Sequence, residues 1–406
     1  MGILHAGGKH ALLTEAITTS QRFTLGFTGL ALGDGTSGQG RITVHNGRIS
    51  EILDSDGPSD FLLPAGATIA PGMIDVHTNG ADEFLFNRDQ GNAVPVASKA
   101  YARSGATAFV ASIMTAPWES MLHAASEVAE AAHDLEERAP QGARCLGIHF
   151  EGPFLNPKFR RIHRNEWILP ANTQRAAALM DASRGTCLMV TMAPEMDGVS
   201  DVARLFYDQG IVCSAGHTSA RYREGMLAIG VGFRTLTHAF NAMPPLDHRE
   251  PSLLAAFIQD KRTTVQVICD GHHVAPAMID ILHRTLGDRV VLATDNMPPS
   301  GPGYKIEGGV VRSDDGTIAG SALEMDRALR NYMSYTELPF ERAIVAATFA
   351  PAQLLNSERD IGTIAVGSRA DFSFWDQHHA VIGTMVGGEL VSGNCLQPTA
   401  AAASSF

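Results

Sequence analysis

Residues 210–241 read GIVCSAGHTSARYREGMLAIGVGFRTLTHAFN and show the alternation of strand-like and helix-like segments on which our fold prediction rests. Two short runs in it, 210–218 and 233–241, are apolar or β-branched along most of their length, and a helix-like stretch separates them. Strands that are apolar on both faces and alternate with helices are typical of a parallel sheet covered by helices. The stretch therefore predicts a parallel strand–helix–strand unit.

The same alternation continues through the middle of the chain. Six further runs bring the total to eight: 68–76, 107–115, 144–151, 187–195, 263–271 and 289–297. The clearest predicted helix follows Trp118, with one apolar stripe and with Pro140 beyond its end. Eight such units predict an α/β fold, a (β/α)₈ barrel, and a doubly wound open sheet is the alternative.

Both ends of the chain are β-rich. Asn46-Gly47 lies between two alternating segments and predicts a hairpin. The segments 362–375 and 380–393 are also strand-like, with glycines at their breaks. We therefore expect one small β-domain built from both ends, and divide the chain as follows: an N-terminal extension 1–22, the β-domain 23–68 plus 356–397, the barrel 69–355 and a disordered tail 398–406.

Charge and composition exclude several classes of function. The 406 residues include 31 Lys and Arg against 43 Asp and Glu, a net charge of −12, which argues against nucleic acid or an anionic membrane as partner. No apolar run approaches the ~18 residues of a membrane span. The five scattered cysteines have no paired zinc-site spacing, and with no apolar secretion signal at the start we expect a reduced, cytoplasmic protein.

Polar side chains follow six of the eight predicted strands, where each strand ends. In a barrel all these ends open onto one face, where catalytic residues collect. A single histidine there is more often structural, but packing alone would favour apolar residues at so many ends. We therefore expect one functional cavity among these residues: Asp75, His77, His149, Glu151, His217, His238, Asn241, Asp270, His272, His273 and Asp295.

The residue types in this set indicate a metal. Imidazole nitrogens and carboxylates without thiolates suit a catalytic Zn²⁺, or Fe²⁺ or Mn²⁺. Catalytic zinc commonly has three protein ligands and one open position. Glu151, His217 and His238 would supply such a set.

Eight motifs occur in an order typical of a known family: PGMIDVHTNG (71–80), HFEGPF (149–154), APE (193–195), GHTSA (216–220), THAFNAMPPLDHREP (237–251), DGHHV (270–274), ATDN (293–296) and GSALEMDRALRN (320–331). Together they resemble the N-acetylglucosamine-6-phosphate deacetylases of the amidohydrolase superfamily. The resemblance implies a (β/α)₈ barrel with a small β-sandwich from both termini. It also implies release of acetate from an N-acetyl amino sugar 6-phosphate, in amino-sugar catabolism.

The resemblance also implies the catalytic roles. Glu151, His217 and His238 correspond to the ligands of one tightly held divalent metal ion. Asp295 corresponds to the general base and acid, and His163 to the histidine that polarises the carbonyl. The loop FRRIHR (159–164) around His163 departs from the family's usual Lys-Gly-Ala-His.

For the substrate, the resemblance implies that Asn241, Ala242 and Arg249 bind the phosphate and that His273 contacts the sugar. It further implies a homodimer. Many superfamily members hold a second ion with His-x-His after the first strand, whereas this chain has His77-Thr78-Asn79. Because an amide is a weak zinc ligand, we expect one firmly bound ion, and a weak second ion at His77 stays open.

Three alternatives remain. The first is the epimeric substrate, N-acetylgalactosamine 6-phosphate. The second is another amidase of the superfamily, of the D-aminoacylase or dihydroorotase type, although the fourth run has no lysine to bridge two metals. The third is a non-catalytic binding protein on an inactivated barrel, which would be expected to have lost a ligand or the base.

Overall fold

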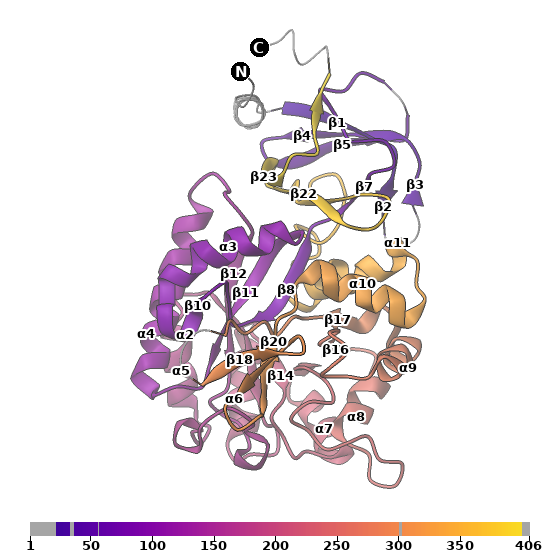
Figure 1. Cartoon of the computed structure of the whole chain (residues 1–406). Helices are drawn as coiled ribbons and strands as arrows, with labels where there is room; N and C mark the ends of the chain where they lie inside the picture. Colours follow the sequence, from indigo (N-terminus) through magenta and orange to yellow (C-terminus); the bar gives the residue numbers. More distant parts are fainter. Residues whose placement is uncertain (1–21, 33–35, 56, 300–302, 400–406) are drawn as a thin grey trace.

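A computed structural model describes residues 22–32, 36–55, 57–299 and 303–399. In it, eight parallel strands form one sheet in which strands that follow one another in sequence are also neighbours in space (Figure 1). A parallel bridge between Thr78 and Asn296 connects its two edges. The predicted (β/α)₈ barrel is confirmed. Its strands are β8 (Met73–Thr78), β11 (Ala106–Met114), β12 (Arg144–Glu151), β13 (Cys187–Met192), β14 (Val212–Ala215), β15 (Phe233–Leu236), β16 (Thr264–Val267) and β17 (Val290–Leu292).

Helices cover the outside of this sheet and bury its apolar outer face (Figure 1). They are α2 (Phe86–Asp89), α3 (Ala93–Arg103), α4 (Trp118–Glu136), α5 (Thr173–Ala182), α6 (Val199–Asp208), α7 (Tyr222–Gly230), α8 (Leu253–Gln259), α9 (Pro276–Leu286), α10 (Met325–Thr336), α11 (Phe340–Ala343) and α12 (Phe349–Leu354). Short 3₁₀ turns lie at Gln90–Asn92, Pro157–Phe159, Asn165–Trp167, Gly287–Arg289 and Ile344–Ala347.

The two ends of the chain meet in a separate β-sandwich (Figure 1). One sheet contains β1 (Arg22–Phe27), β4 (Gly40–His45), β5 (Arg48–Leu53), β6 (Phe61–Leu62) and β24 (Gln397–Pro398). The other contains β2 (Leu30–Ala31), β3 (Thr36–Ser37), β7 (Thr68–Pro71), β21 (Phe372–Trp375), β22 (Val381–Val386) and β23 (Glu389–Gly393). Apolar side chains from both sheets form one core between them. The predicted Asn46-Gly47 hairpin is confirmed, with positive φ at both turn residues.

The run 68–76 is not the single strand that we predicted. Its first part, β7, pairs with β21 in the sandwich, and its second part, β8, belongs to the barrel. Gly72 lies between the two strands. A Cβ at this position would lie 2.0 Å from Thr107 Oγ1, so a larger residue would not fit where the chain passes Thr107. The chain therefore changes domain at Gly72, and the boundary that we placed at 68/69 falls inside β7.

The ends of the predicted domains need two further corrections. Arg22 already belongs to β1, and Pro398 pairs with Phe61 while the Thr399 amide donates to the Asp60 carbonyl at 2.9 Å, so the tail does not begin at 398. The rest of the extension (1–21) and of the tail (400–406) lies outside the described residues. Nor did we predict the three-stranded antiparallel sheet of β18 (Tyr304–Glu307), β19 (Val310–Ser313) and β20 (Ile318–Ser321), or the short pair β9 (Gly80–Ala81) and β10 (Phe84–Leu85).

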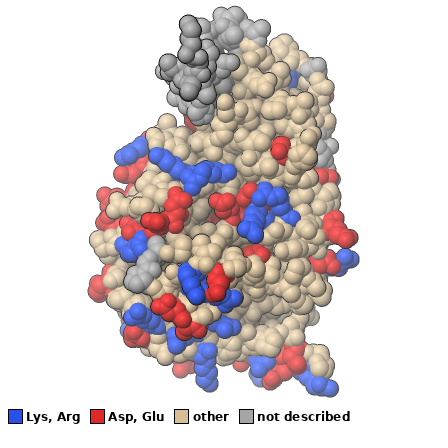
Figure 2. All heavy atoms as spheres, viewed as in Figure 1, with Lys and Arg blue, Asp and Glu red and all other residues tan. Residues whose placement is uncertain are grey.

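The surface carries charges of both signs. Figure 2 shows acidic and basic side chains interspersed over one face of the molecule, without a single large basic field. Within the part of the chain that the structure describes, no helix has the length and apolar character needed to span a bilayer. All five cysteines are free thiols.

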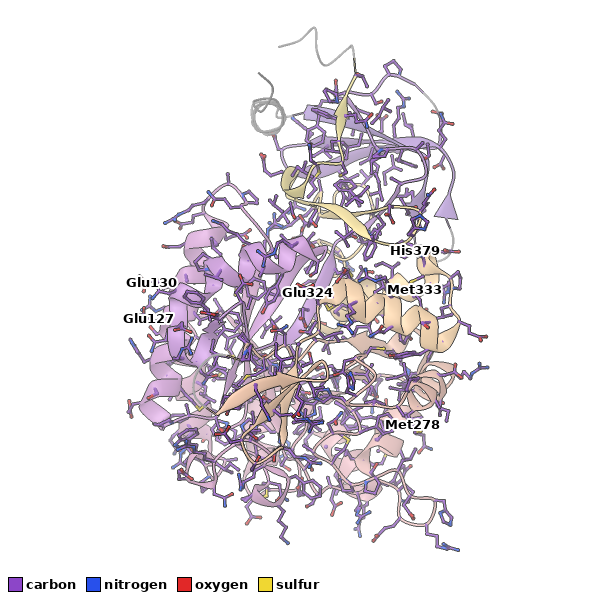
Figure 3. All side chains as sticks on the ribbon, viewed as in Figure 1. Glu127, Glu130, Met278, Glu324, Met333 and His379 are labelled. Atoms are coloured by element: carbon purple, nitrogen blue, oxygen red, sulfur yellow. The ribbon has the colours of Figure 1, made fainter. Side chains whose placement is uncertain are left out.

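Helix α4 shows how the sequence pattern sets the packing. The apolar stripe predicted after Trp118 includes Met121, Ala125 and Val128, and all three are buried against the barrel. Glu127 and Glu130 of the same helix lie along the outer edge of the molecule in Figure 3. The predicted helix after Trp118 is confirmed, and it illustrates the one-sided burial that the barrel imposes on its outer layer.

Candidate metal centre and active site

The carboxyl ends of the barrel strands meet at a cavity of about 250 Å³. Glu151 is the last residue of β12, whereas His217, His238 and Asp295 follow β14, β15 and β17 by two or three residues. All four line this cavity together with His163, Asn241, Ala242 and His273. The structure thus brings together eight of the predicted site residues from segments that are far apart in sequence.

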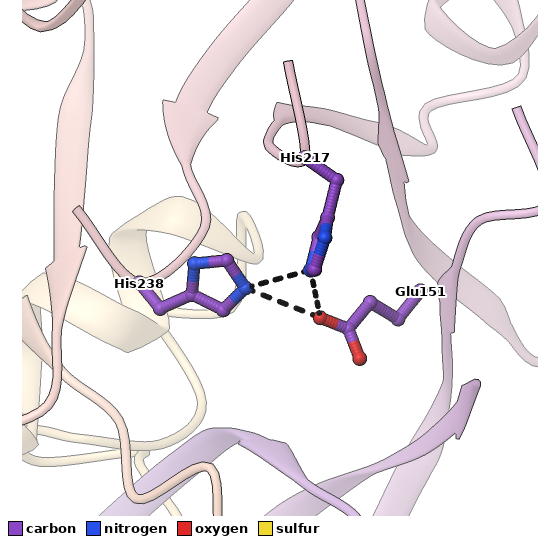
Figure 4. A group of neighbouring side chains, drawn as sticks. All are labelled: Glu151, His217 and His238. Atoms are coloured by element: carbon purple, nitrogen blue, oxygen red, sulfur yellow. Dashed lines mark hydrogen bonds and ion pairs between the residues drawn. The ribbon is translucent and has the colours of Figure 1, made fainter. Parts of the chain in front are cut away.

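Glu151, His217 and His238 converge most closely (Figure 4). Glu151 Oε1 lies 3.0 Å from His217 Nε2 and 3.2 Å from His238 Nε2, and the two nitrogens are 3.1 Å apart. Ligand atoms about 2.0–2.2 Å from a tetrahedral zinc ion lie about 3.3 Å from one another. All three residues are buried, and their spacing suits one small cation.

The protonation of this cluster supports the same conclusion. His217 Nδ1 lies 2.9 Å from the Phe159 carbonyl oxygen, so Nδ1 carries the hydrogen and Nε2 presents a lone pair to Glu151. Burial lowers the pKa of both His217 and His238, which keeps them neutral. Burial opposes the ionisation of Glu151, but the adjacent His77, together with the contacts of His163, His217 and His238, outweighs it and holds the pKa of Glu151 well below its usual range. Three acceptors that face one another in this way fit a divalent cation.

The backbone at these positions is strained. His217, His238 and Asp295 have φ values of 47°, 33° and 47°, in the left-handed region that disfavours side chains other than glycine. Each such residue costs about 1–3 kcal/mol and persists only where the surroundings hold it in place. The Asp295 amide donates to the His77 carbonyl at 2.8 Å, and the His217 carbonyl accepts from the Asn156 amide at 2.9 Å.

Glu195, from the APE motif, fixes the loop that carries His217. Its Oε1 accepts from the Ser219 amide at 2.6 Å and from Asn156 Nδ2 at 2.8 Å, and its Oε2 accepts from the Thr218 hydroxyl. These contacts join the ends of β12, β13 and β14 around one carboxylate. Glu195 does not line the cavity, so it acts on the site by holding His217 in position.

Asp295 is held by one oxygen and left open at the other. Asn79 Nδ2 donates to Asp295 Oδ1 at 2.8 Å, and His77 Nε2 lies 3.5 Å from the same oxygen. Among the described residues no donor is within hydrogen-bond distance of Oδ2. The second oxygen is therefore available to accept a proton from a group in the cavity.

His77 is buried between two carboxylates. Its Nε2 lies 3.5 Å from Asp295 and 3.7 Å from Glu151, and neither ring nitrogen has a hydrogen-bond partner. Burial opposes protonation, but the charges of Asp295 and Glu151 outweigh it and raise the pKa of His77 to about 9. His77 is not one of the three residues whose ligand atoms all lie within 4.8 Å. A weak second ion at His77 stays a prediction.

Two further histidines of the cavity are oriented by their neighbours. His163 Nδ1 lies 2.8 Å from Thr115 Oγ1, and its Nε2 lies 3.8 Å from Glu151 Oε2. His273 Nδ1 lies 2.6 Å from Asp270 Oδ2. Although burial opposes ionisation of Asp270, hydrogen bonding from His273 lowers its pKa, so this carboxylate fixes the His273 ring.

Besides His77, four of the predicted strand-end residues do not line the cavity, and three of these four are buried in the barrel or its loops. Asp75 accepts from the Thr294 amide at 3.2 Å and thereby ties β8 to the end of β17. His149 Nε2 lies 2.7 Å from Thr191 Oγ1 inside the barrel. Asp270 acts through His273, and His272 is exposed beside it. These residues take structural or positioning roles.

The structure does not bring Arg249 to the cavity of its own chain. This residue is exposed in the loop after β15, where its amide donates to Asp247 Oδ1 at 2.8 Å, and it does not line the cavity. The cavity wall also contains residues that we did not predict: Met114, Arg161, Ile162, Thr317, Ile318, Ala319 and Gly320. The arginines of the FRRIHR loop are a sequence signal that could have indicated Arg161, but no strand-end pattern indicates Thr317 or the residues of β20.

Comparisons with known proteins show what the chain as a whole is similar to. The sequence profile of the Amidohydrolase family matches residues 68–391. The N-acetylglucosamine-6-phosphate deacetylase of Vibrio furnissii is 31% identical over 86% of this chain and 90% of its own length. The N-acetylgalactosamine-6-phosphate deacetylase of Escherichia coli O157:H7 is 29% identical, over 80% and 88%. One similar solved structure is a variant of the N-acetyl-D-glucosamine-6-phosphate deacetylase of Mycobacterium smegmatis, in complex with N-acetyl-D-glucosamine-6-phosphate. It superposes with a TM-score of 0.85 at 30% identity, over 92% of this chain and 100% of that chain.

Proposed function

Because the chain belongs to the amidohydrolase family, we propose that it is a metal-dependent deacetylase that hydrolyses N-acetylglucosamine 6-phosphate to glucosamine 6-phosphate and acetate. The observation that carries this proposal is the convergence of three buried acceptors, Glu151, His217 and His238, on the cavity that Asp295 lines. A binding protein on an inactivated barrel would not need both the ligand set and the open carboxylate.

The three acceptors would hold one divalent cation, which we propose to be Zn²⁺, with Fe²⁺ or Mn²⁺ as alternatives. Such a cation supplies Lewis acidity, which polarises a carbonyl and lowers the pKa of water from 15.7 toward about 7. The ligands themselves are neutral imidazoles and one carboxylate, so the charge of the ion is only partly compensated.

Asp295 moves the proton. Its free Oδ2 takes a proton from the attacking water and later returns it to the nitrogen of the leaving amine, as the carbon–nitrogen bond breaks and the new carbon–oxygen bond gives acetate. Asn79 and His77 hold Oδ1 during this transfer. General acid–base catalysis of this kind typically contributes about 10²- to 10⁴-fold in rate.

His163 is suited to polarise the acetyl oxygen. If the Thr115 hydroxyl donates to Nδ1, the neutral ring carries its hydrogen on Nε2, which lies toward the cluster. Removing one preorganised donor to a developing oxyanion typically costs about 3–4 kcal/mol. The Thr115 contact therefore supports the role that we propose for His163.

For the substrate, we propose that Asn241, Ala242 and Arg249 bind the phosphate and that His273 Nε2 binds the sugar. Arg249 would act from a second copy of the chain or after its loop moves, since it does not line the cavity of its own chain. A homodimer would provide the first arrangement. The homodimer and the cytoplasmic location stay predictions.

The galactosamine epimer is the second candidate substrate, because one relative of 29% identity is named for it. Amidases of the D-aminoacylase or dihydroorotase type are not favoured. The strand β13, CLMVTM, has no lysine that could be carboxylated to bridge two metals.

The test is acetate release from N-acetylglucosamine and N-acetylgalactosamine, each with and without a 6-phosphate, combined with elemental analysis. We expect turnover of a 6-phosphate and about one ion per chain. Glu151→Gln should lose both the ion and the activity, whereas the matched control Glu127→Gln, a glutamate of α4, should keep both. Turnover by a metal-free protein, or no turnover of either phosphate, would overturn the proposal.

A further inference from the structure

Arg161 is the only arginine or lysine that lines the cavity, among the residues that the structure describes. We propose that Arg161 is a second cation, supplied by the same chain, that binds the phosphate of the substrate in addition to Arg249, and that it contributes to the preference for phosphorylated over unphosphorylated amino sugars. This inference rests on the proposed function and deepens it, since the predicted phosphate residue Arg249 lies outside the cavity.

The charge of the cavity favours such a cation. The cavity already contains two carboxylates, Glu151 and Asp295, and the chain has a net charge of −12. A phosphate brings nearly two more negative charges into the same cavity of about 250 Å³. One divalent ion offsets the two carboxylates, and His77, which is buried between them, does not line the cavity. A cationic side chain on the cavity wall is therefore the group of the same chain that the phosphate can contact directly.

The side chains of the other two arginines of the loop already contact neighbouring residues. Arg160 Nη1 donates to the carbonyl oxygens of Arg161 and His163, at 3.2 and 3.0 Å. The guanidinium of Arg164 lies 4.8 Å from the centre of the Trp167 ring. The guanidinium of Arg161 has no hydrogen bond or ion pair with any described residue, and the residue is exposed. It is therefore the arginine that remains available for a ligand.

The backbone at Arg161 indicates that its side chain is needed. Its φ is 52°, in the left-handed region where glycine would be free of strain and arginine is not. The residue lies in a turn closed by the His163 amide, which donates to the Arg160 carbonyl at 2.9 Å. An arginine kept at a cost in a position that suits glycine is expected where the side chain itself has a function.

The turn is also anchored on both sides. Ile162 packs against an apolar cluster that contains Leu85, Met297 and Ala319, and the next residue, His163, is held by Thr115. The loop that positions His163 toward the cluster thus also fixes the backbone of Arg161 at the cavity wall. The two residues would contact opposite parts of one substrate, the phosphate and the acetyl group.

The decisive variant is Arg161→Gly, because glycine removes the guanidinium and relieves the strain, so that folding should be preserved. We expect kcat/KM for the 6-phosphate sugar to fall about 10- to 100-fold, the usual effect of losing a charge-assisted contact, and activity on the unphosphorylated sugar to change less than about threefold. Arg161→Lys should recover part of the loss. Arg164→Ala, which removes the same charge from the same loop, should leave both activities unchanged.

Calorimetric binding of glucosamine 6-phosphate and of inorganic phosphate gives a readout that does not depend on turnover. Both affinities should fall in Arg161→Gly and persist in Arg164→Ala. Equal losses on both sugars, or a phosphate-specific loss in Arg249→Ala with none in Arg161→Gly, would overturn the assignment. If the wild type releases no acetate but binds phosphate through Arg161, the proposed function fails while this inference stands.

Discussion

The two ends of strand β12 use buried charge in opposite ways. At its start, Arg144 donates from Nη1 to both oxygens of the buried Asp371, each at 2.9 Å, and so joins the barrel to the sandwich. At its end, Glu151 contacts imidazoles, and no arginine or lysine among the described residues pairs with it. Within the eight residues of one strand, the arginine at the start pairs with a buried carboxylate of the sandwich, whereas the glutamate at the end has no arginine or lysine as partner among the described residues.

The difference distinguishes a structural charge from a functional one. The pairing at the sandwich end continues outward, where Arg369 contacts Glu136 at 2.9 Å and Asp360 at 2.8 Å. Each carboxylate there has an arginine partner, so no ligand is needed to balance its charge. At the cavity end the acceptors outnumber the donors, which is the arrangement expected where a cation and a substrate complete the site.

The largest expected effect is at the cavity end. Asp295→Asn keeps the shape of the side chain but cannot accept a proton, so turnover should fall about 10³-fold or more while the protein keeps its metal. Acetate release and elemental analysis measure both quantities. Near-normal turnover in this variant would show that the open carboxylate has no catalytic role, and the contrast between the two ends would disappear.

The opposite result is expected at the sandwich end. Arg144→Met leaves Asp371 buried without its partner, and breaking such a pair typically costs about 3–5 kcal/mol of unfolding free energy. The folded fraction should keep its kcat. Urea unfolding measures the loss, and the double variant Arg144→Met/Asp371→Leu should recover much of it. A stable single variant would mean that the pair contributes no structural stability.

A smaller effect is expected at Glu195, which holds the His217 loop without touching the cavity. Glu195→Gln should lower metal affinity about 10- to 100-fold, the usual range for a residue that orients a ligand, with little change in the unfolding transition of the loaded protein. Competition with a chelator measures the affinity. Unchanged affinity would show that the backbone alone positions His217.

The smallest effect is expected for the exposed ion pair of Arg48 and Asp360, at 2.6 Å. Solvent screens such pairs, so Arg48→Gln should change the unfolding free energy by less than about 1 kcal/mol and leave acetate release unaltered. The same urea titration as for Arg144 measures it. A loss of unfolding free energy as large as that of Arg144→Met would contradict the view that the burial of an ion pair, rather than pairing alone, determines how much it stabilises the protein.

Local pattern predicted the barrel and the terminal β-domain, and together with the motif resemblance it indicated the three acceptors Glu151, His217 and His238. Each of these follows from residues close in sequence, since strand periodicity and the polar residue at a strand end are properties of short segments. The tertiary structure decided the division of 68–76 at Gly72, the wall formed by β20, and the presence of Arg161 rather than Arg249 at the cavity. These features depend on contacts between segments far apart in the chain, such as Gly72 and Thr107. A short stretch of sequence does not indicate which distant residues it contacts in the folded protein.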